Sequence, residues 1–410
     1  MKTIKSLKKY LIKNHINIKK SNNKLGIKIF HVGVLLLASA PSISFLLLTI
    51  SAISGTFNRK DNYFKDKYNF PFLLASILMV INCLIITIRT DFINNQDPSL
   101  AWIGLLNWIP FFWCFWSFQI YLKNETLRIQ AAIYFLIGSL PVLFSGFTQY
   151  FLGWYGPYEI FNKLIIWYQR PLIDGAGVTG LFNNYNYSGA WLSIVLALIV
   201  GLFFKSANNK NQKLITLIFI FAFIYMIILT TSRNALLAVL ITIISLIPIK
   251  KIRFLFISVF AGLGFLITTL IPIFPSNIQN SIFTFIPSSL LVKTTLNSIN
   301  ELNSFPRIEL WLKSIKLIKS NLLIGYGGGS FSDLYNLNNG QFEGMQHSHN
   351  LILEIAFNYG LPSSILIIGG MLFILFNSYS GLKSNRKESH LKIKKNFDEF
   401  NNAWITSFII

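Results

Sequence analysis

The chain has 410 residues, of which 53% are hydrophobic and 12% are charged, and its mean hydropathy of +0.54 is too high for a soluble globular protein. Its formal net charge of +21 would suit a nucleic-acid-binding protein, but the basic residues are spread along the chain rather than gathered in one patch. Both cysteines, Cys83 and Cys114, fall inside apolar stretches, which excludes a disulfide framework and a CxxC metal site.

Apolar stretches long enough to cross a bilayer recur along the chain, because about 20 helical residues span its hydrocarbon core. A further apolar segment, 29–54, contains Pro41, which lacks an N–H and disfavours a helical residue before it. We therefore expect a tight hairpin or two short helices there, with a single span as the alternative. The clearest predicted spans are 70–89, 99–121, 130–153, 187–204, 214–231, 234–249, 253–273 and 350–376.

Most lysines and arginines fall in alternate connections between these spans. The basic segments are 1–28, 55–69, 122–129, 205–213, 250–253 and 382–395. The positive-inside rule places such segments in the cytoplasm, which also puts the N-terminus there and the long segment 274–348 outside. The sequence therefore predicts an all-α integral membrane protein with about 10 crossings. We expect one polytopic domain over residues 1–410, a helix bundle that includes a large, partly helical periplasmic loop over 274–348.

Several polar residues lie on the predicted outer side. Arg233 stands between two apolar spans, where a charge usually faces a polar cavity or a partner, although snorkelling to the interface is the alternative. Arg170 and the segment GLFNNYNYSG (180–189) fall on the same side. The asparagines of that segment can offer amide donors and acceptors, or can simply form a loop and a helix cap.

Within 274–348, a helix is predicted after Pro306, with apolar residues at helical spacing that suit a membrane surface or the bundle. These residues are Ile308, Trp311, Leu312, Ile315, Ile318 and Leu322. Arg307 begins this helix and could hold an anion together with the helix N-terminus, or could be a solvated arginine. The following IGYGGGSF (324–331) lacks the GK[ST] ending of a P-loop, so we interpret it as a helix stop with Gly325 as the cap.

His347 and His349 precede the last clear span. An HxH pair can bind a metal, but the sequence places no convincing third ligand nearby. The alternatives are a buried structural histidine and a general base, since neutral imidazole can take a proton from a hydroxyl. Asn350 follows directly, and Glu354 lies one helical turn further on, where a carboxylate should face the bundle rather than lipid.

Together these segments resemble the O-antigen ligase and O-antigen polymerase superfamily of bacterial polytopic membrane glycosyltransferases. His349, Asn350 and Gly360 match the spacing of the family's histidine motif, whereas Ser363 stands where the family has Gly, Thr or Tyr. The segment SFPRIELWLKSIKLIKSNLLIGYGGGSF is similar to the family's loop segment, and TSRNALL is similar to its intramembrane arginine segment. GLFNNYNYSGAWL is similar to its F-x-N-P-N stretch, with Tyr185 in place of the proline. The resemblance covers residues 170–376.

The resemblance implies transfer of a glycan from a polyprenyl-diphosphate carrier to a glycan or glycolipid acceptor, a step of lipopolysaccharide or other polysaccharide biosynthesis. The reaction would run with inversion and without a metal or other cofactor, at the periplasmic face of a bacterial inner membrane, and no nucleic acid would take part. His349 would be the general base, and Arg233 and Arg307 would bind the diphosphate. His347, Arg170, Asn350 and Glu354 would support them.

Other functions remain open at this point. A polymerase of the same superfamily shares these motifs and differs from a ligase in its acceptor. A transporter for a small anion would use Arg233 in its pathway, but such proteins usually place their polar residues near the membrane midplane. Relative to the family's twelve-helix layout, the chain is expected to be incomplete at its C-terminal end, which also suggests an inactive truncated paralogue.

Overall fold

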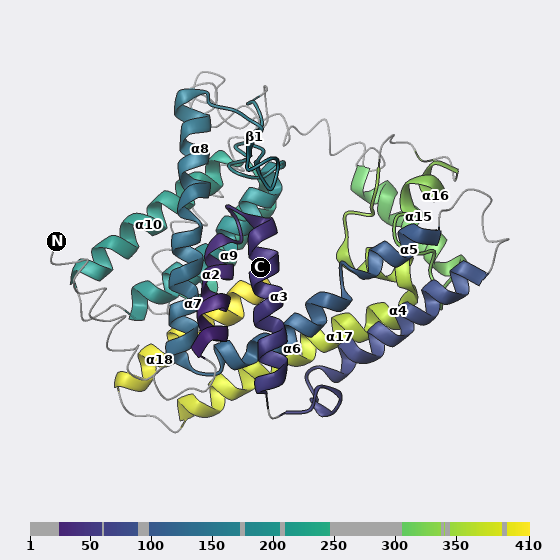
Figure 1. Cartoon of the computed structure of the whole chain (residues 1–410), viewed down its shortest axis with the longest axis horizontal. Helices are drawn as coiled ribbons and strands as arrows, with labels where there is room; N and C mark the ends of the chain where they lie inside the picture. Colours follow the sequence, from purple (N-terminus) through teal and green to yellow (C-terminus); the bar gives the residue numbers. More distant parts are fainter. Residues whose placement is uncertain are drawn as a thin grey trace, which may run out of the picture. The chain divides into compact units, whose positions relative to one another are not determined.

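The computed structural model describes residues 24–59, 61–88, 98–172, 177–205, 210–246, 306–337, 340, 345–387 and 392–410 (Figure 1). These residues form two compact units. Unit 1 comprises Met1–Asn58, Gln119–Thr294 and Tyr379–Ile410, and unit 2 comprises Arg59–Phe118 and Thr295–Ser378.

Unit 1 is a helix bundle with one β-hairpin. Its helices are α2 (Lys24–Leu36), α3 (Pro41–Asn58), α7 (Glu125–Gly138), α8 (Leu140–Leu152), α9 (Tyr185–Lys205), α10 (Lys210–Leu229), α11 (Arg233–Leu246) and α18 (Lys392–Ile409). The hairpin pairs β1 (Tyr158–Ile160) with β2 (Ile165–Trp167) in antiparallel register. Unit 2 contains the short 3-10 helix η1 (Tyr63–Lys65), α4 (Phe70–Ile88), α5 (Pro98–Leu105), α15 (Pro306–Ser320) and α16 (Phe331–Leu337). It also holds most of α6 (Ile109–Leu122) and of α17 (Leu351–Lys387).

The predicted all-α polytopic architecture is confirmed. Among the described residues, 7 helices or helix pairs are long and apolar enough to cross a membrane. They cover the predicted spans at 70–89, 99–121, 130–153, 187–204, 214–231 and 350–376, and they add α3. The span predicted at 234–249 corresponds to the shorter α11, and the one predicted at 253–273 lies outside the described residues.

The segment 29–54 contains two helices rather than one span. Pro41 is the first residue of α3, where its missing N–H costs nothing because the first helical N–H groups have no partner anyway. The hydroxyl of Ser44 donates to the carbonyl of Gly33 across the turn at 2.7 Å. The turn predicted at Pro41 is therefore confirmed.

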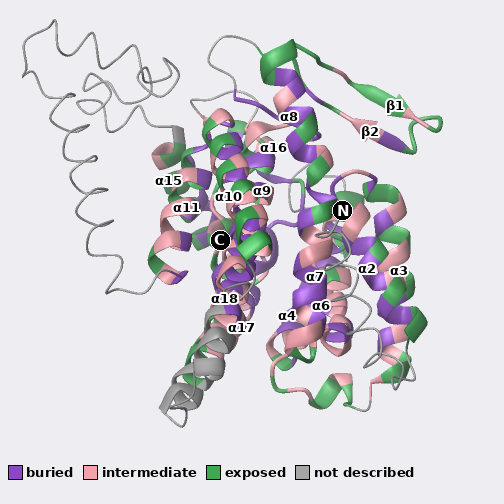
Figure 2. Ribbon diagram, turned by 90° about the vertical axis from the view of Figure 1, so that its left-hand side faces the viewer, coloured by how far each residue is buried: buried purple, intermediate pink, exposed green. Residues whose placement is uncertain are grey.

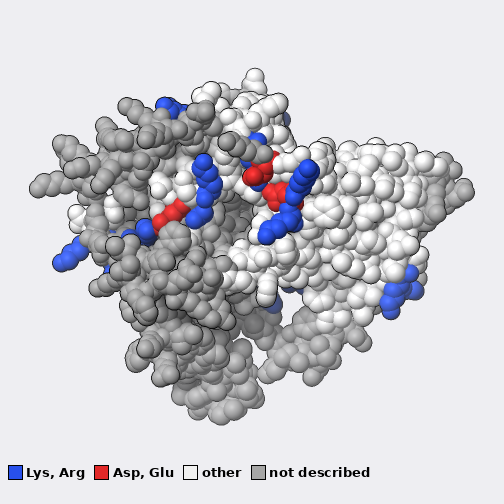
Figure 3. Space-filling view, turned by 90° about the horizontal axis from the view of Figure 1, so that it is seen from below, with Lys and Arg blue, Asp and Glu red and all other residues white. Residues whose placement is uncertain are grey.

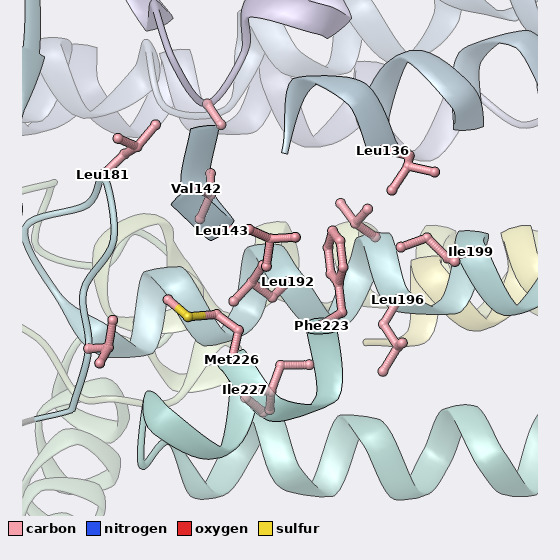
Figure 4. Packing of buried hydrophobic residues seen from close by; sticks show 14 residues of the cluster. Leu136, Val142, Leu143, Leu181, Leu192, Leu196, Ile199, Phe223, Met226 and Ile227 are labelled. Atoms are coloured by element: carbon pink, nitrogen blue, oxygen red, sulfur yellow. The ribbon is translucent and has the colours of Figure 1, made fainter. Parts of the chain in front are cut away.

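The core of unit 1 forms where α9 packs against α7, α8 and α10 (Figure 4). Leu192, Leu196 and Ile199 recur on one face of α9 at helical spacing, which explains why this face is buried. Phe223, Met226 and Ile227 of α10 point into the same cluster.

Polar contacts indicate which loops of unit 1 lie at the same end. Lys205, at the end of α9, forms an ion pair with Glu125, at the start of α7. At the opposite end of α9, the amide of Val178 donates to the carbonyl of Leu229 at 2.9 Å. The end of α9 and the start of α7 therefore share one end of unit 1, which agrees with the charge pattern. On the face shown in Figure 3, acidic side chains likewise lie directly beside basic ones.

In unit 2 the long helix α17 is broken at Gly360, whose φ of 78° and ψ of 160° are not helical. Pro362 has no N–H, and the N–H of Leu361 donates to Leu322 at 2.8 Å, so the carbonyls of Phe357 and Asn358 lose their partners in the helix. The N–H groups of Tyr326 and Gly327 replace these partners at 2.8 and 2.9 Å. The glycine-rich segment is therefore a backbone connection to α17.

Gly325 has a φ of 74°, and its N–H donates to the carbonyl of Asn321 at 3.1 Å. This left-handed residue closes the turn that follows α15, as the sequence predicted for the helix stop.

Candidate active site

The turn before α17 carries both histidines. Asn350 caps the helix, because its Oδ1 accepts hydrogen bonds from the amides of Ile352 at 3.0 Å and Leu353 at 3.3 Å. This capping fixes where the helix begins, so the imidazole of His349 lies directly beside the helix N-terminus. Both His347 and His349 are exposed, and their ring centroids are 4.1 Å apart in an edge-on arrangement.

Glu354 holds this turn in place. Its Oε2 accepts hydrogen bonds from the backbone N–H of Ser348 at 3.0 Å and from the hydroxyl of Ser348 at 3.1 Å. Its Oε1 accepts from the side-chain amide of Asn358 at 3.0 Å. The carboxylate faces protein groups, as predicted, and it ties the residue before His349 to the body of α17.

His349 itself adopts a φ of 53°, which is uncommon for a residue with a side chain. Such a conformation persists when its surroundings fix it on both sides, and it is frequent at functional sites. Here the cap at Asn350 and the bonds from Ser348 to Glu354 provide that fixation. The backbone therefore fixes the direction in which the side chain of His349 leaves the turn.

Arg307 lies close enough to act on His349 electrostatically. Desolvation lowers the pKa of His349 below its ordinary value of 6.5, and the positive charges of His347 and Arg307 lower this pKa further. The negative charge of Glu354 opposes them and raises it. At neutral pH His349 is therefore mostly the neutral imidazole, the form that accepts a proton.

Packing of α15 fixes the position of Arg307. Leu310, Leu317 and Ile318 of α15 are buried against α16 and α17. In the first turn of α15, Glu309 accepts a hydrogen bond from the hydroxyl of Tyr335, which is fully buried. The exposed guanidinium of Arg307 thus starts a helix that is held at its beginning and along its length.

Arg233 is in unit 1, as the first residue of α11. The preceding Ser232 donates its hydroxyl to Oδ1 of Asn186 at 2.9 Å, which joins the start of α11 to the start of α9. Both helices present their N-terminal, partially positive ends here, so the exposed Arg233 adds a full positive charge to a region that already favours anions.

Arg170, also in unit 1, lies on a loop that Gln149 of α8 fixes. The Oε1 of Gln149 accepts hydrogen bonds from the amides of Thr179 and Gly180, both at 3.0 Å. Its Nε2 donates to the carbonyl of Arg170 and to the hydroxyl of Thr179. Sequence reasoning missed Gln149, although a polar amide inside an apolar span is a signal of function or of a buried network.

The structure brings His347, His349, Asn350, Glu354 and Arg307 together in unit 2. Arg170 and Arg233 belong to unit 1, so their convergence with the histidines stays a prediction. Within the described residues, no group of three or more His, Cys, Asp or Glu side chains could hold a metal ion.

The part of the chain that carries Arg233, Arg307 and His349 is similar in sequence to a known protein family. Residues 217–368 match a family model described as O-antigen ligase. No curated protein matches the chain. The family match and the apolar helices agree on a multi-pass membrane protein, and residues 217–368 are similar to the O-antigen ligase family.

Proposed function

We propose that the chain is an O-antigen ligase-like glycosyltransferase of the bacterial inner membrane. It would move a glycan from a polyprenyl-diphosphate carrier to an acceptor hydroxyl at the periplasmic face. The observation that carries this proposal is the His349 turn, in which a neutral imidazole is held beside Arg307 within the segment that matches the family. A base and an anion-binding group side by side are what such a transfer requires.

The reaction would be a single displacement with inversion. The acceptor oxygen attacks the anomeric carbon and forms the new glycosidic bond, while its proton passes to the ring nitrogen of His349 that lacks hydrogen. The bond from the anomeric carbon to the diphosphate oxygen breaks, and its electron pair stays on the diphosphate. Protonated His349 then returns its proton to solvent, so the site regenerates itself.

The arginines would act on the leaving group. As the glycosyl bond breaks, negative charge grows on the diphosphate, and fixed positive groups stabilise that charge more strongly than the starting state. Arg307 offers a guanidinium at the start of α15. Arg233 offers another where α9 and α11 begin side by side. Guanidinium groups suit this task because they bind phosphate oxygens in pairs.

The proposal can be tested with purified full-length protein, a lipid-linked glycan and candidate acceptors. We expect His349→Ala to lower the rate of transfer about 10²–10⁴-fold, the usual contribution of a general base. Gln346→Ala alters an exposed neighbour in the same segment and should keep the rate of the unaltered protein. Equal rates for His349→Ala and the unaltered protein would remove His349 from the mechanism.

The choice of acceptor separates two enzymes of this superfamily. A ligase transfers the glycan to a glycolipid core, whereas a polymerase transfers it to a second lipid-linked glycan. Offering both acceptors in one reaction and resolving the products by mass shows which is used. We expect the glycolipid product, and we expect a chelator to leave its rate unchanged.

A further inference from the structure

A pocket of about 660 Å³ lies in unit 1 between α8 and the β1–β2 hairpin. Its volume is within the range of roughly 300–1,000 Å³ that is typical of small-molecule sites. Figure 2 shows the hairpin extending from the end of α8. The pocket is lined by Phe144, Ser145, Thr148, Trp154, Pro157, Tyr158, Glu159, Ile160, Trp167 and Gln169. None of these residues is part of the histidine turn in unit 2.

Hydrogen bonds fix the hairpin on α8 and so preform the pocket. The amide of Trp154 donates to the carbonyl of Thr148 at 3.3 Å, and Nε2 of Gln169 donates to the carbonyl of Ser145 at 2.7 Å. On the far side, the indole N–H of Trp167 donates to the carbonyl of Ser39 at 2.7 Å. A preformed pocket loses little conformational entropy when a ligand enters.

Aromatic rings form much of the wall. Tyr158 and Trp167 are cross-strand partners, so both side chains lie on the same face of the hairpin. Phe144 adds a ring from α8, and Trp154 is 49% exposed. Rings with one apolar face still accessible can stack against the flat C–H face of a sugar ring.

The floor of the pocket offers acceptors that lack a donor. Gln169 is only 3% exposed, and no described residue donates a hydrogen bond to its Oε1. The hydroxyl of Ser145, also 3% exposed, has no partner among the described residues. Buried polar atoms without a partner are unfavourable, and a ligand that carries hydroxyl groups would satisfy them. A hydrocarbon chain would leave them unsatisfied.

The charge of the lining argues against an anionic ligand. Glu159 is the only charged residue among the ten that line the pocket, and none of them is a lysine or an arginine. A diphosphate or an anionic lipid head group would therefore meet no cation in the lining and one carboxylate. A neutral ligand rich in hydroxyl groups fits both the acceptors and the charge.

We propose that this pocket is a subsite for a neutral sugar ring of a glycan. That the glycan belongs to the lipid-linked donor rests on the proposed function, whereas the binding itself does not. By holding a sugar other than the one that reacts, the pocket would favour long glycans over a single sugar. This makes it a determinant of substrate length.

Binding can be measured without catalysis on full-length protein in nanodiscs. The chain has nine tryptophans, so the signal of Trp154 is taken as the fluorescence difference between the unaltered protein and Trp154→Phe. The probes are methyl glycosides of glucose, galactose, mannose and rhamnose, and nanodiscs made with brominated phosphatidylcholine. We expect a saturable response to at least one glycoside. Tyr158→Ala should weaken this response about fivefold or more, whereas Tyr155→Ala, an exposed ring outside the lining, should preserve it.

The outcomes separate the subsite from the reaction. His349→Ala should bind the glycoside as the unaltered protein does, because the histidine is not part of the lining. If no glycoside changes the Trp154 signal, the subsite is refuted. It is equally refuted if brominated lipid quenches Trp154 and glycosides do not relieve the quenching, since the occupant is then a lipid. An active His349→Ala that still binds sugar would contradict only the proposed function.

Discussion

The side chain of His349 is surrounded by groups that set its protonation. Burial, His347 and Arg307 lower its pKa below 6.5, and Glu354 alone among the contributing groups raises it. The neutral form is therefore retained down to a lower pH than for a free histidine. We expect the rate of transfer to fall on the acidic side with a midpoint below 6.5, which a pH profile of kcat/KM measures.

Replacement of His347 tests whether positive charge on this neighbour lowers the pKa of His349. His347→Asn removes a group whose positive charge lowers the pKa of His349, so the acidic midpoint should move to higher pH. Gln346→Asn changes a neighbouring exposed residue that makes no such contribution and should leave the midpoint in place. A midpoint unmoved by His347→Asn would mean that another group controls the profile.

Glu354 matters as an acceptor of hydrogen bonds. Glu354→Leu removes both carboxylate oxygens, so the Oε2 that accepts from the N–H and from the hydroxyl of Ser348 is lost. We expect kcat to fall by roughly 10²-fold, the cost of displacing a catalytic group by about 1 Å. The KM of the donor should change little, because the hydrogen bonds of Glu354 to described residues go to Ser348 and Asn358 rather than to an arginine. Steady-state kinetics at varied donor concentration separate the two parameters.

Asn358→Leu is the matched variant for this prediction. It removes the other hydrogen bond of Glu354 but leaves both bonds to Ser348 available. The loss of kcat should therefore be smaller than for Glu354→Leu. A loss of the same size in both variants would indicate general destabilisation of α17, which thermal unfolding in detergent would reveal.

Sequence reasoning singled out His349, Asn350, Glu354 and Arg307, and the structure places them together in unit 2. Their roles in catalysis stay a prediction. Gln149 and Gln169 were missed. No sequence spacing reveals the role of such an amide, because its hydrogen-bond partners lie 20 or more residues away along the chain.

At the level of helices, the break in α17 defines how the glycine-rich segment is attached. Gly360→Ala should destabilise the folded protein. A Cβ at this position would overlap the carbonyl of Leu323, and the φ of 78° is strained for alanine. We expect a loss of at least about 2 kcal/mol in the free energy of unfolding. The midpoint of thermal unfolding in detergent measures the effect.

Gly369→Ala is its control within the same helix. No atom lies within 4 Å of the Cβ that it adds, and its backbone is helical. Alanine there should be neutral or slightly stabilising, since it is the better helix former. Equal destabilisation by both variants would contradict the role assigned to the break at Gly360.

Helices were predicted more accurately than the way they pack. The spans and the turn at Pro41 follow from apolar length and from proline chemistry. On α15, Trp311, Leu312 and Ile315 of the predicted apolar stripe are exposed, whereas Ile318 of that stripe is buried together with Leu310 and Leu317. An apolar residue has several helical neighbours of similar character, so spacing alone does not select the face that meets α16 and α17. The β1–β2 hairpin was missed because its strands are only 3 residues long.

For the whole molecule, the side of the membrane on which each loop lies stays a prediction, and it can be tested directly. Contacts in unit 1 place Glu125 and Lys205 at one end and the residues around 178 and 229 at the other. In a variant without native cysteines, Lys163→Cys should react with a membrane-impermeant maleimide in intact cells. Lys210→Cys, at the start of α10, should react only after the inner membrane is opened, because the positive-inside rule predicts that this basic segment faces the cytoplasm. The reverse pattern would invert the topology and move the proposed site to the cytoplasm.

The junction between residues 326–327 and the interrupted turn of α17 uses main-chain atoms alone. It depends on a left-handed glycine and on the missing proline amide, and side-chain atoms form neither of its two hydrogen bonds. The shape of the backbone therefore maintains this connection, and both of its partners lie within 217–368, the segment that matches the family model.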